Sequence, residues 1–299
     1  MRQGSKPGRF VLREFQRLTV KEEITVSQLK KRVSGLPALS LLSMTVLTAA
    51  GVAGPAEADT ATGNIGVFSK YVLRGNTGSR DQVPPKSVAN PENNNTAVQG
   101  GFDWTWDSGL FLGYWGSNLG YSYDKSNPTV NFVSNGFEND FYGGYSGKLG
   151  AMPYSIGLTQ YYYINVDDSN VAELFGTLGM GPVTFGFKYL LQDAFWGNAG
   201  DTYLTATYTA DLPKGFKFSG TAGHYLYDKQ DSKELCGGAA GCGLTTTSSA
   251  FRHVDLTLSH PIGKTGAEAG VTYIIGGKLR TEQDLENTAV LFVKYAFDL

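Results

Sequence analysis

Apolar and polar side chains alternate along the last nine positions of the chain. Every second residue there is apolar: Leu291, Val293, Tyr295, Phe297 and Leu299. A period of two predicts a β-strand with one apolar face. Such a segment is typical of the strand that closes a bacterial outer-membrane barrel. The alternative is the final strand of a soluble β-sandwich.

The same pattern recurs from position 63 onward, separated by turn-forming residues. It predicts twelve strands, at 64–74, 97–106, 110–119, 138–147, 152–164, 171–178, 183–191, 202–210, 216–227, 251–260, 265–275 and 289–299. Short links follow the even strands and longer loops follow the odd ones. This alternation favours a membrane barrel with periplasmic turns and outer loops. The predicted fold class is all-β, a 12-stranded antiparallel up-and-down transmembrane β-barrel.

The N-terminal region has the features of an export signal. Lys30, Lys31 and Arg32 precede the apolar stretch 36–50, and an A-x-A site ends at Ala58. A membrane-anchor helix is the alternative. We therefore expect residues 1–58 to be a cleavable signal peptide with an upstream extension, and residues 59–299 to form one barrel domain.

Composition supports an exported membrane protein. Charged residues are 17% of the chain, below the roughly 25% usual for soluble proteins, and there are 39 glycines and 13% aromatic residues. The predicted signal holds nine of the 25 basic and four of the 27 acidic residues, which leaves 16 against 23, a formal charge of −7. An acidic exported chain is a poor partner for nucleic acid.

Charged residues on the predicted inner face are the main candidate site. The set is Lys70, Arg74, Asp103, Glu138, Asp140, Glu173, Lys188, Lys217, Asp255, Glu268 and Lys294. They either line a mixed-charge pore or form a salt-bridge network that plugs the barrel. Asp103, on the strand next to the first, is the expected local partner of Lys70 and Arg74, and Glu138, Asp140 and Glu268 are the alternatives across the bore. Balanced signs argue against strong ion selectivity.

Cysteine and catalytic signals are few. Cys236 and Cys242 stand in a glycine-rich loop, which favours a disulfide in an oxidising compartment. No metal or cofactor motif appears. Gly223-His224 begins the Gly-His-x-Ser-Asn-Gly motif of outer-membrane phospholipases, but Leu226 stands where the serine nucleophile is needed. The sequence therefore predicts no catalytic residues and no enzyme.

Aromatic residues are expected at the two membrane interfaces. Trp104 and Trp106 precede a short turn and are assigned to the periplasmic girdle. Trp196 and the tyrosines at 161–163 are assigned to the outer rim. An aromatic slide for sugars inside the barrel is the alternative.

Three stretches together resemble one protein family. They read NIGVFSKYVLRG at 64–75, AVQGGFDW at 97–104 leading into LGYWGSNL at 112–119, and ENDFYGGYSG at 138–147. They are similar to the TorF-type porin family of proteobacterial outer-membrane proteins, formerly a conserved-hypothetical group. The resemblance implies an outer-membrane barrel and a channel, and it supplies no substrate and no catalytic residues.

The predicted function is a porin-like channel in the outer membrane of a Gram-negative bacterium, for passive diffusion of small hydrophilic solutes. The alternative is a plugged structural or surface-interaction barrel that works through its extracellular loops. Expected partners are outer-membrane lipid and lipopolysaccharide, the barrel-assembly machinery through the C-terminal strand, and the solutes themselves. Nucleic acid is not expected as a partner.

Overall fold

The computed structural model describes residues 59–76, 96–120, 122, 124, 136–194, 196–228 and 245–299. All of them belong to one compact unit of the chain, Ser40–Leu299. The predicted signal peptide lies outside the described residues. Among the residues described, no helical segment has the length and apolar character needed to cross a membrane.

The described residues form twelve strands and one short 3₁₀ turn, Pro213–Gly215. The first six strands are β1 (Thr60–Phe68), β2 (Ala97–Thr105), β3 (Leu110–Asn118), β4 (Phe137–Leu149), β5 (Met152–Ile164) and β6 (Ala172–Met180). The others are β7 (Val183–Leu190), β8 (Thr202–Asp211), β9 (Lys217–Leu226), β10 (Ser249–Pro261), β11 (Ala267–Gly276) and β12 (Thr288–Asp298).

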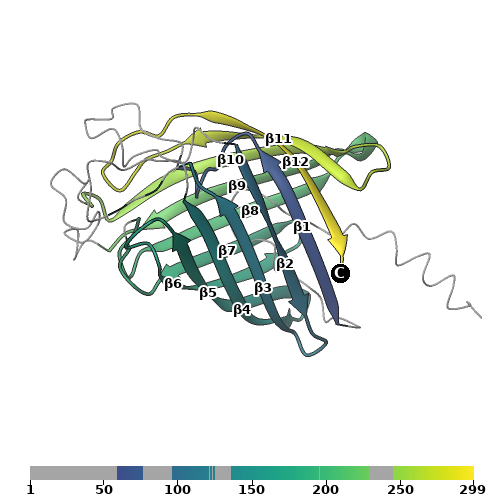
Figure 1. Cartoon of the computed structure of the whole chain (residues 1–299), viewed down its shortest axis with the longest axis horizontal. Coiled ribbons are helices and arrows are strands. Elements are labelled where there is room, and N and C mark those ends of the chain that lie inside the picture. The colour runs from purple at the N-terminus through teal and green to yellow at the C-terminus, as the bar shows by residue number, and fades with distance from the viewer. Residues whose placement is uncertain are drawn as a thin grey trace, which may run out of the picture. The chain divides into compact units, whose positions relative to one another are not determined.

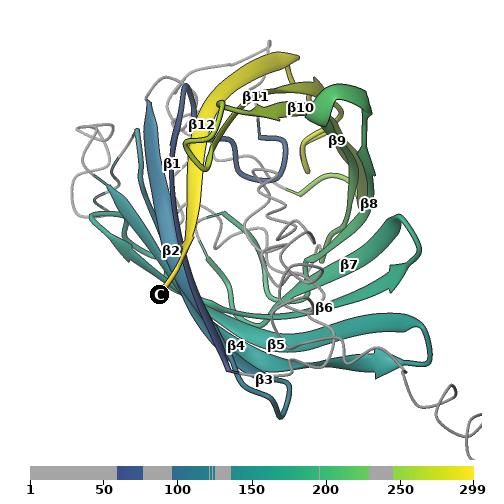
Figure 2. The same ribbon diagram turned by 90° about the vertical axis from the view of Figure 1, so that its right-hand side faces the viewer.

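The strands close into a single antiparallel barrel. Each strand pairs with its neighbours in sequence, and β1 also pairs with β12, with Ile65 opposite Tyr295. Figure 1 shows neighbouring strands lying side by side, and Figure 2 shows β12 lying beside β1 where the ring closes. The predicted 12-stranded up-and-down barrel is confirmed.

One predicted strand is wrong at both ends. β1 runs from Thr60 to Phe68, whereas the alternating pattern predicted 64–74, so it begins four residues earlier and stops six residues earlier than predicted. The other eleven strands lie within two residues of their predicted bounds, and Met152–Ile164 matches at both ends. The strand ends joined by the long connections 69–96, 119–136, 165–171, 191–201, 227–248 and 277–287 all lie at one rim, as predicted.

The outer face of the barrel is apolar. Each of the twelve strands has at least one large apolar side chain that is exposed. In β5 the exposed residues Ile156, Leu158 and Tyr162 alternate with the buried residues Ser155, Thr159 and Tyr161. Exposed apolar rows around a closed antiparallel barrel are stable against lipid and not against water. The protein is therefore a transmembrane barrel of the outer membrane.

The interior is packed at the rim with the long connections. A buried cluster there combines residues of the strands with residues of the connections: Phe68, Tyr71, Val72, Ala97, Leu119, Tyr161, Tyr163, Val166, Val171, Leu190, Ala194, Ile274, Val290 and Phe292. Buried polar and charged side chains occupy the remaining inner positions. Side chains therefore fill part of the barrel, and their arrangement defines the candidate site.

Candidate functional site

The chain turns into the barrel directly after β1. We call residues 69–76 the inward segment. Tyr71, Val72 and Arg74 are all at most 3% exposed. The segment ends in a tight turn in which Asn76 N donates to Leu73 O at 2.8 Å, and Arg74 and Gly75 have φ of 47° and 68°. A Cβ atom at Gly75 would overlap the His253 ring, so only glycine fits there.

Arg74 is the central cation of the interior. Its Nη2 donates to both oxygens of Glu173, at 2.9 and 2.7 Å, and its Nη1 donates to the Tyr225 hydroxyl at 3.1 Å. The guanidinium also lies over the rings of Trp196 and Tyr203. Burial is the largest influence and lowers the pKa of Arg74, but the Glu173 carboxylate together with the hydroxyls of Tyr225 and Tyr161 outweighs it and raises the pKa above its usual range. The side chain therefore stays a cation.

The ion pair between Arg74 and Glu173 crosses the bore. Glu173 belongs to β6. Between β1 and β6 the ring contains β2–β5 in one direction and β7–β12 in the other, so the two strands lie on different sides of the barrel. Tyr71 makes a second crossing contact, because its hydroxyl donates to Glu138 Oε2 on β4 at 2.6 Å. Lys188 of β7 completes the set, with Nζ 3.7 Å from Glu173 Oε2. We call Arg74, Glu138, Asp140, Glu173 and Lys188 the charged layer.

His253 and Arg252 of β10 contact the inward segment at its turn. His253 is fully buried and hydrogen-bonded at both ring nitrogens, to Tyr203 Oη at 2.6 Å and to Asp255 Oδ1 at 2.7 Å. Arg252 Nε donates to the backbone oxygen of Arg74 at 3.1 Å. With both ring nitrogens bonded and no exposed surface, His253 positions the turn at Gly75.

A second charged cluster lies nearer the short turns. Glu268 Oε1 accepts from Lys294 Nζ and Glu268 Oε2 accepts from Lys217 Nζ, each at 2.9 Å. We call these three residues the wall cluster. They lie on β9, β11 and β12, which are on the same side of the ring, because only β10 lies between β9 and β11. Asp103 is apart from them and accepts from the Tyr142 hydroxyl at 2.5 Å. This cluster lines one side of the interior and does not cross it.

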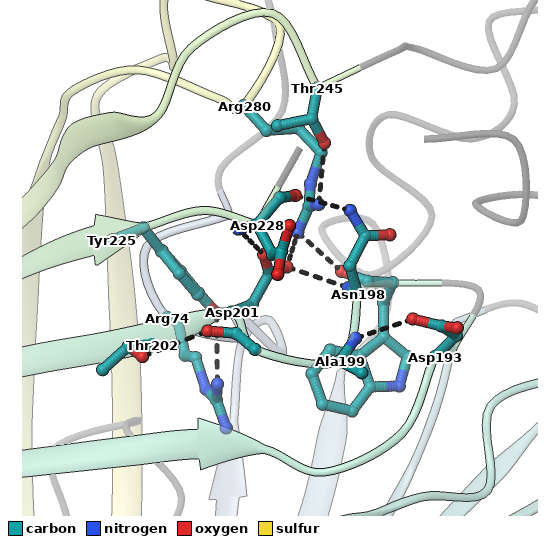
Figure 3. A network of polar contacts seen from close by, with 12 residues as sticks. Arg74, Asp193, Asn198, Ala199, Asp201, Thr202, Tyr225, Asp228, Thr245 and Arg280 are labelled. Carbon is teal, nitrogen blue, oxygen red and sulfur yellow. Dashed lines mark hydrogen bonds and ion pairs between the residues drawn. The ribbon is translucent and has the colours of Figure 1, made fainter. Parts of the chain in front are cut away.

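A third group of contacts joins three of the long connections. Arg280 Nη2 donates to Asp201 Oδ2 at 2.6 Å, and Nη1 donates to Thr245 Oγ1 at 3.1 Å. Asp201 also accepts from the backbone nitrogens of Asn198 and Asp228. Figure 3 shows Arg280 extending from its connection toward Asp201. We call Arg280 and Asp201 the loop latch.

Most of the predicted inner charges are found inside, but with other partners than expected. Arg74 pairs with Glu173, so the prediction of Asp103 as its partner is wrong. Lys70 stays outside the charged layer and donates to Thr288 Oγ1 at 2.8 Å. Their role in lining an open pore stays a prediction.

The aromatic prediction is partly wrong. Trp104 is exposed on the outer face near a short turn, as expected. Tyr161 and Tyr163 are buried in the interior, where their hydroxyls donate to Glu173 and Glu138. Trp196 packs on Tyr161, with ring centroids 5.6 Å apart. Tyr162 alone of the three tyrosines is exposed outside.

Sequence reasoning missed several inner residues. Arg252, Asp201 and Arg280 were not among the predicted inner charges, because Asp201 and Arg280 lie in connections and Arg252 has the even numbering of the exposed residues Leu256 and Leu258. The register shifts between Phe251 and His253, which marks a β-bulge. A bulge turns two consecutive residues to one side, so Arg252 and His253 both face inward. Cys236 and Cys242 lie outside the described residues.

A family model matches the chain, whereas a comparison with curated proteins found no match. The model is that of a bacterial protein of unknown function, Gcw_chp, and it matches residues 52–232. This description does not confirm the TorF-type resemblance, which stays a prediction.

Solved structures of outer-membrane porins and channels match the chain at low identity. The KdgM porin is 9% identical, with a TM-score of 0.44, covering 79% of this chain and 99% of that chain. The NanC porin is 10% identical, with a TM-score of 0.43, covering 80% and 99%. The COG4313 outer membrane channel from Pseudomonas putida F1 is 9% identical, with a TM-score of 0.45, covering 82% and 97%. No conclusion about solutes follows from likenesses of this size.

Proposed function

This chain belongs to the Gcw_chp family of bacterial proteins of unknown function, and we propose that it is an outer-membrane channel for passive diffusion of small hydrophilic solutes. The proposal includes the predicted setting, in which outer-membrane lipid and lipopolysaccharide surround the barrel. It also includes delivery to the membrane by the barrel-assembly machinery, which would recognise β12.

The polar inner face is the observation that carries this proposal. Hydroxyl pairs connect neighbouring strands on that face, Thr207 with Thr221 at 3.0 Å and Thr257 with Thr272 at 2.8 Å. The wall cluster adds charges that are partly accessible, since the Lys217 side chain is 35% exposed. Hydroxyl and charged groups replace the water shell of a polar solute, whereas an apolar lining would exclude it. The interior of a twelve-stranded barrel is intermediate in width between that of eight-stranded barrels, which side chains fill, and that of sixteen-stranded barrels, which contain an aqueous channel.

The charged layer is the narrow point of the proposed channel. The inward segment brings Arg74 to the far strands, and Glu138, Asp140 and Glu173 are all at most 1% exposed. Solutes from the long-loop side would pass only beside this layer or after the inward segment moves. Passage would therefore depend on the contact between Arg74 and Glu173.

The burial of the same layer favours a second function. If the inward segment never leaves, the protein is a plugged barrel that acts through its extracellular connections. Ion pairs across the bore and the packed apolar cluster around Tyr71 support this alternative. The two functions differ in whether ions cross the wild-type protein.

Conductance of the purified protein in planar bilayers tests the proposal. We expect wild-type conductance steps, and larger steps for Arg74→Gln, because loss of the bidentate contact to Glu173 releases the inward segment. Lys278→Gln is the matched control, since its pair with Asp284 is more than half exposed and lies in a connection. Wild-type silence at every voltage, together with a conducting Arg74→Gln variant, would reject the open channel and leave the plugged barrel.

A further inference from the structure

The charged layer contains one more carboxylate than cation. Its acids are Glu138, Asp140 and Glu173, and its bases are Arg74 and Lys188. All five side chains are buried, with Lys188 the most exposed at 7%. Buried charges are stable when they are paired. One negative charge in this layer therefore lacks a countercharge.

Hydrogen bonding identifies the carboxylate without a partner. Glu138 accepts from the hydroxyls of Tyr71 and Tyr163, and Glu173 accepts from Arg74 and from the hydroxyl of Tyr161. Neither oxygen of Asp140 has a hydrogen-bond partner, although the residue is 0% exposed. Of the three acids, Asp140 is therefore the one whose oxygens can accept from a ligand.

A second unpartnered group, Thr159, lies diagonally across from Asp140 on the same inner face. Thr159 is also 0% exposed, and its Oγ1 has no hydrogen-bond partner. In the register, Asp140 is opposite Tyr161 on β5, and Thr159 is two residues before Tyr161 on the same inner face. Such diagonal neighbours on one face of an antiparallel pair are about 7–8 Å apart, so the two short side chains leave room for one small cation to bridge them. Asp140 and Thr159 together present three unpartnered oxygen atoms.

We propose that Asp140 and Thr159 form a binding site for the primary ammonium group of a small solute. A primary ammonium has one positive charge and three N–H donors, which match the one missing charge and the three acceptor atoms. Among the described residues no group of three or more His, Cys, Asp or Glu side chains is arranged to hold a metal ion. A hydrogen-bonding cation is therefore the better match.

This inference deepens the proposed function and rests on it, since it names amines as the solutes that the channel binds. Asp140 and Thr159 are fully buried, so an amine reaches them only when the surrounding layer loosens. The ammonium group would then neutralise the third carboxylate and stabilise the layer around itself. Binding is consequently measurable as added resistance of the folded protein to heat, without any transport assay.

The test compares methylammonium, tetramethylammonium and sodium chlorides at equal ionic strength, with the purified protein in detergent. We expect only methylammonium to raise the thermal midpoint of the wild-type protein. At tenfold above its dissociation constant, it should raise the ratio of folded to unfolded protein roughly elevenfold. The effect should be lost in Asp140→Asn and reduced in Thr159→Val. Asp211→Asn, at the exposed end of β8, is the control that keeps it.

Three results would overturn the site. An equal effect of tetramethylammonium, which has no N–H donor, would reject hydrogen bonding to Asp140 and Thr159. An effect that persists in both Asp140→Asn and Thr159→Val would place the amine elsewhere. The third result combines two observations: methylammonium does not change the thermal midpoint of the wild-type protein, and Asp140→Asn is at least as heat-resistant as the wild type. Together they would show that Asp140 is buried as a neutral acid.

The two proposals fail separately. Conductance without any methylammonium effect on the thermal midpoint would reject the amine site and keep the channel. A methylammonium effect in a protein that conducts no ions would reject the channel and keep the site, as the amine pocket of a plugged barrel.

Discussion

Glu268 on β11 lies directly opposite Lys294 on β12, and Lys294 Nζ donates to Glu268 Oε1 at 2.9 Å. The second oxygen of the same carboxylate accepts from Lys217. One acid is thus shared by two bases, and the wall cluster has a net charge of +1.

The wall cluster predicts how ion preference changes with charge. Glu268→Gln leaves the two lysines without a carboxylate, so we expect the reversal potential in a salt gradient to shift toward anions. Lys294→Gln should shift it toward cations. Lys217→Gln should have a smaller effect, because its side chain is 35% exposed and screened by water. Unchanged reversal potentials in conducting variants would show that ions do not pass the wall cluster.

The outer face predicts sensitivity to buried charge in lipid. Leu158 lies near the middle of β5 and is 52% exposed. Leu158→Arg should lower the free energy of unfolding in phospholipid vesicles by about 2–4 kcal/mol, because a guanidinium replaces an alkyl group at the bilayer midplane. Leu158→Ala is the control for lost packing. Equal costs for the two substitutions would contradict the assignment of this face to lipid.

The barrel could be predicted from sequence because lipid imposes a strict alternation. In the middle of β5 outward residues meet hydrocarbon and inward residues meet polar groups, so Ile156 and Leu158 alternate with Ser155 and Thr159. The bounds of Met152–Ile164 follow directly from that alternation. The same reasoning located the short turns, because the pattern breaks at Gly150 and Gly181, which both have positive φ.

The inward segment could not be predicted in this way. Tyr71 continues the apolar period of Ile65 and Val67, yet it packs inside the barrel and bonds Glu138. An apolar side chain satisfies either a lipid contact or an interior contact, so the period alone does not distinguish them. The contact between Arg74 and Glu173 was equally hidden, because it joins the inward segment to β6, and the two are close only when the ring is closed.

The predicted disulfide remains to be tested, since Cys236 and Cys242 lie outside the described residues. Their spacing, with five residues between them, predicts one closed peptide in mass spectrometry of the unreduced protein. The double substitution of both cysteines to serine should cost roughly 2 kcal/mol or less, because a short loop removes little chain entropy. Two free thiols in protein from freshly isolated membranes would contradict the prediction.

The loop latch predicts a local change with little effect on the barrel. Arg280→Ala removes the ion pair with Asp201 and the stacking of the guanidinium over Tyr227, at 4.7 Å. We expect faster cleavage by proteinase K within 191–201 and 277–287, with the thermal midpoint of the barrel nearly unchanged. Lys278→Ala is the control, because its pair with Asp284 is largely exposed. Equal cleavage rates in the two variants would mean that the latch does not hold these connections.

Breaking the contact between Arg74 and Glu173 should be the most destabilising single change. Each partner is at most 3% exposed, so Arg74→Met leaves a buried carboxylate and Glu173→Leu leaves a buried guanidinium. Removing one partner of a buried pair costs about 3–5 kcal/mol. The double variant should recover part of this loss, because no unpaired charge remains at that contact. Thermal unfolding in detergent measures all three variants.

Lys70→Met separates this effect from a general loss of positive charge. Lys70 lies in the same inward segment but bonds Thr288 outside the charged layer. Its loss should cost much less than that of Arg74, because one hydrogen bond to a hydroxyl contributes about 1 kcal/mol.

If the Arg74 and Glu173 effects were simply additive, the two side chains would not act as a pair. The inward segment would then be held by Tyr71 and the apolar cluster alone.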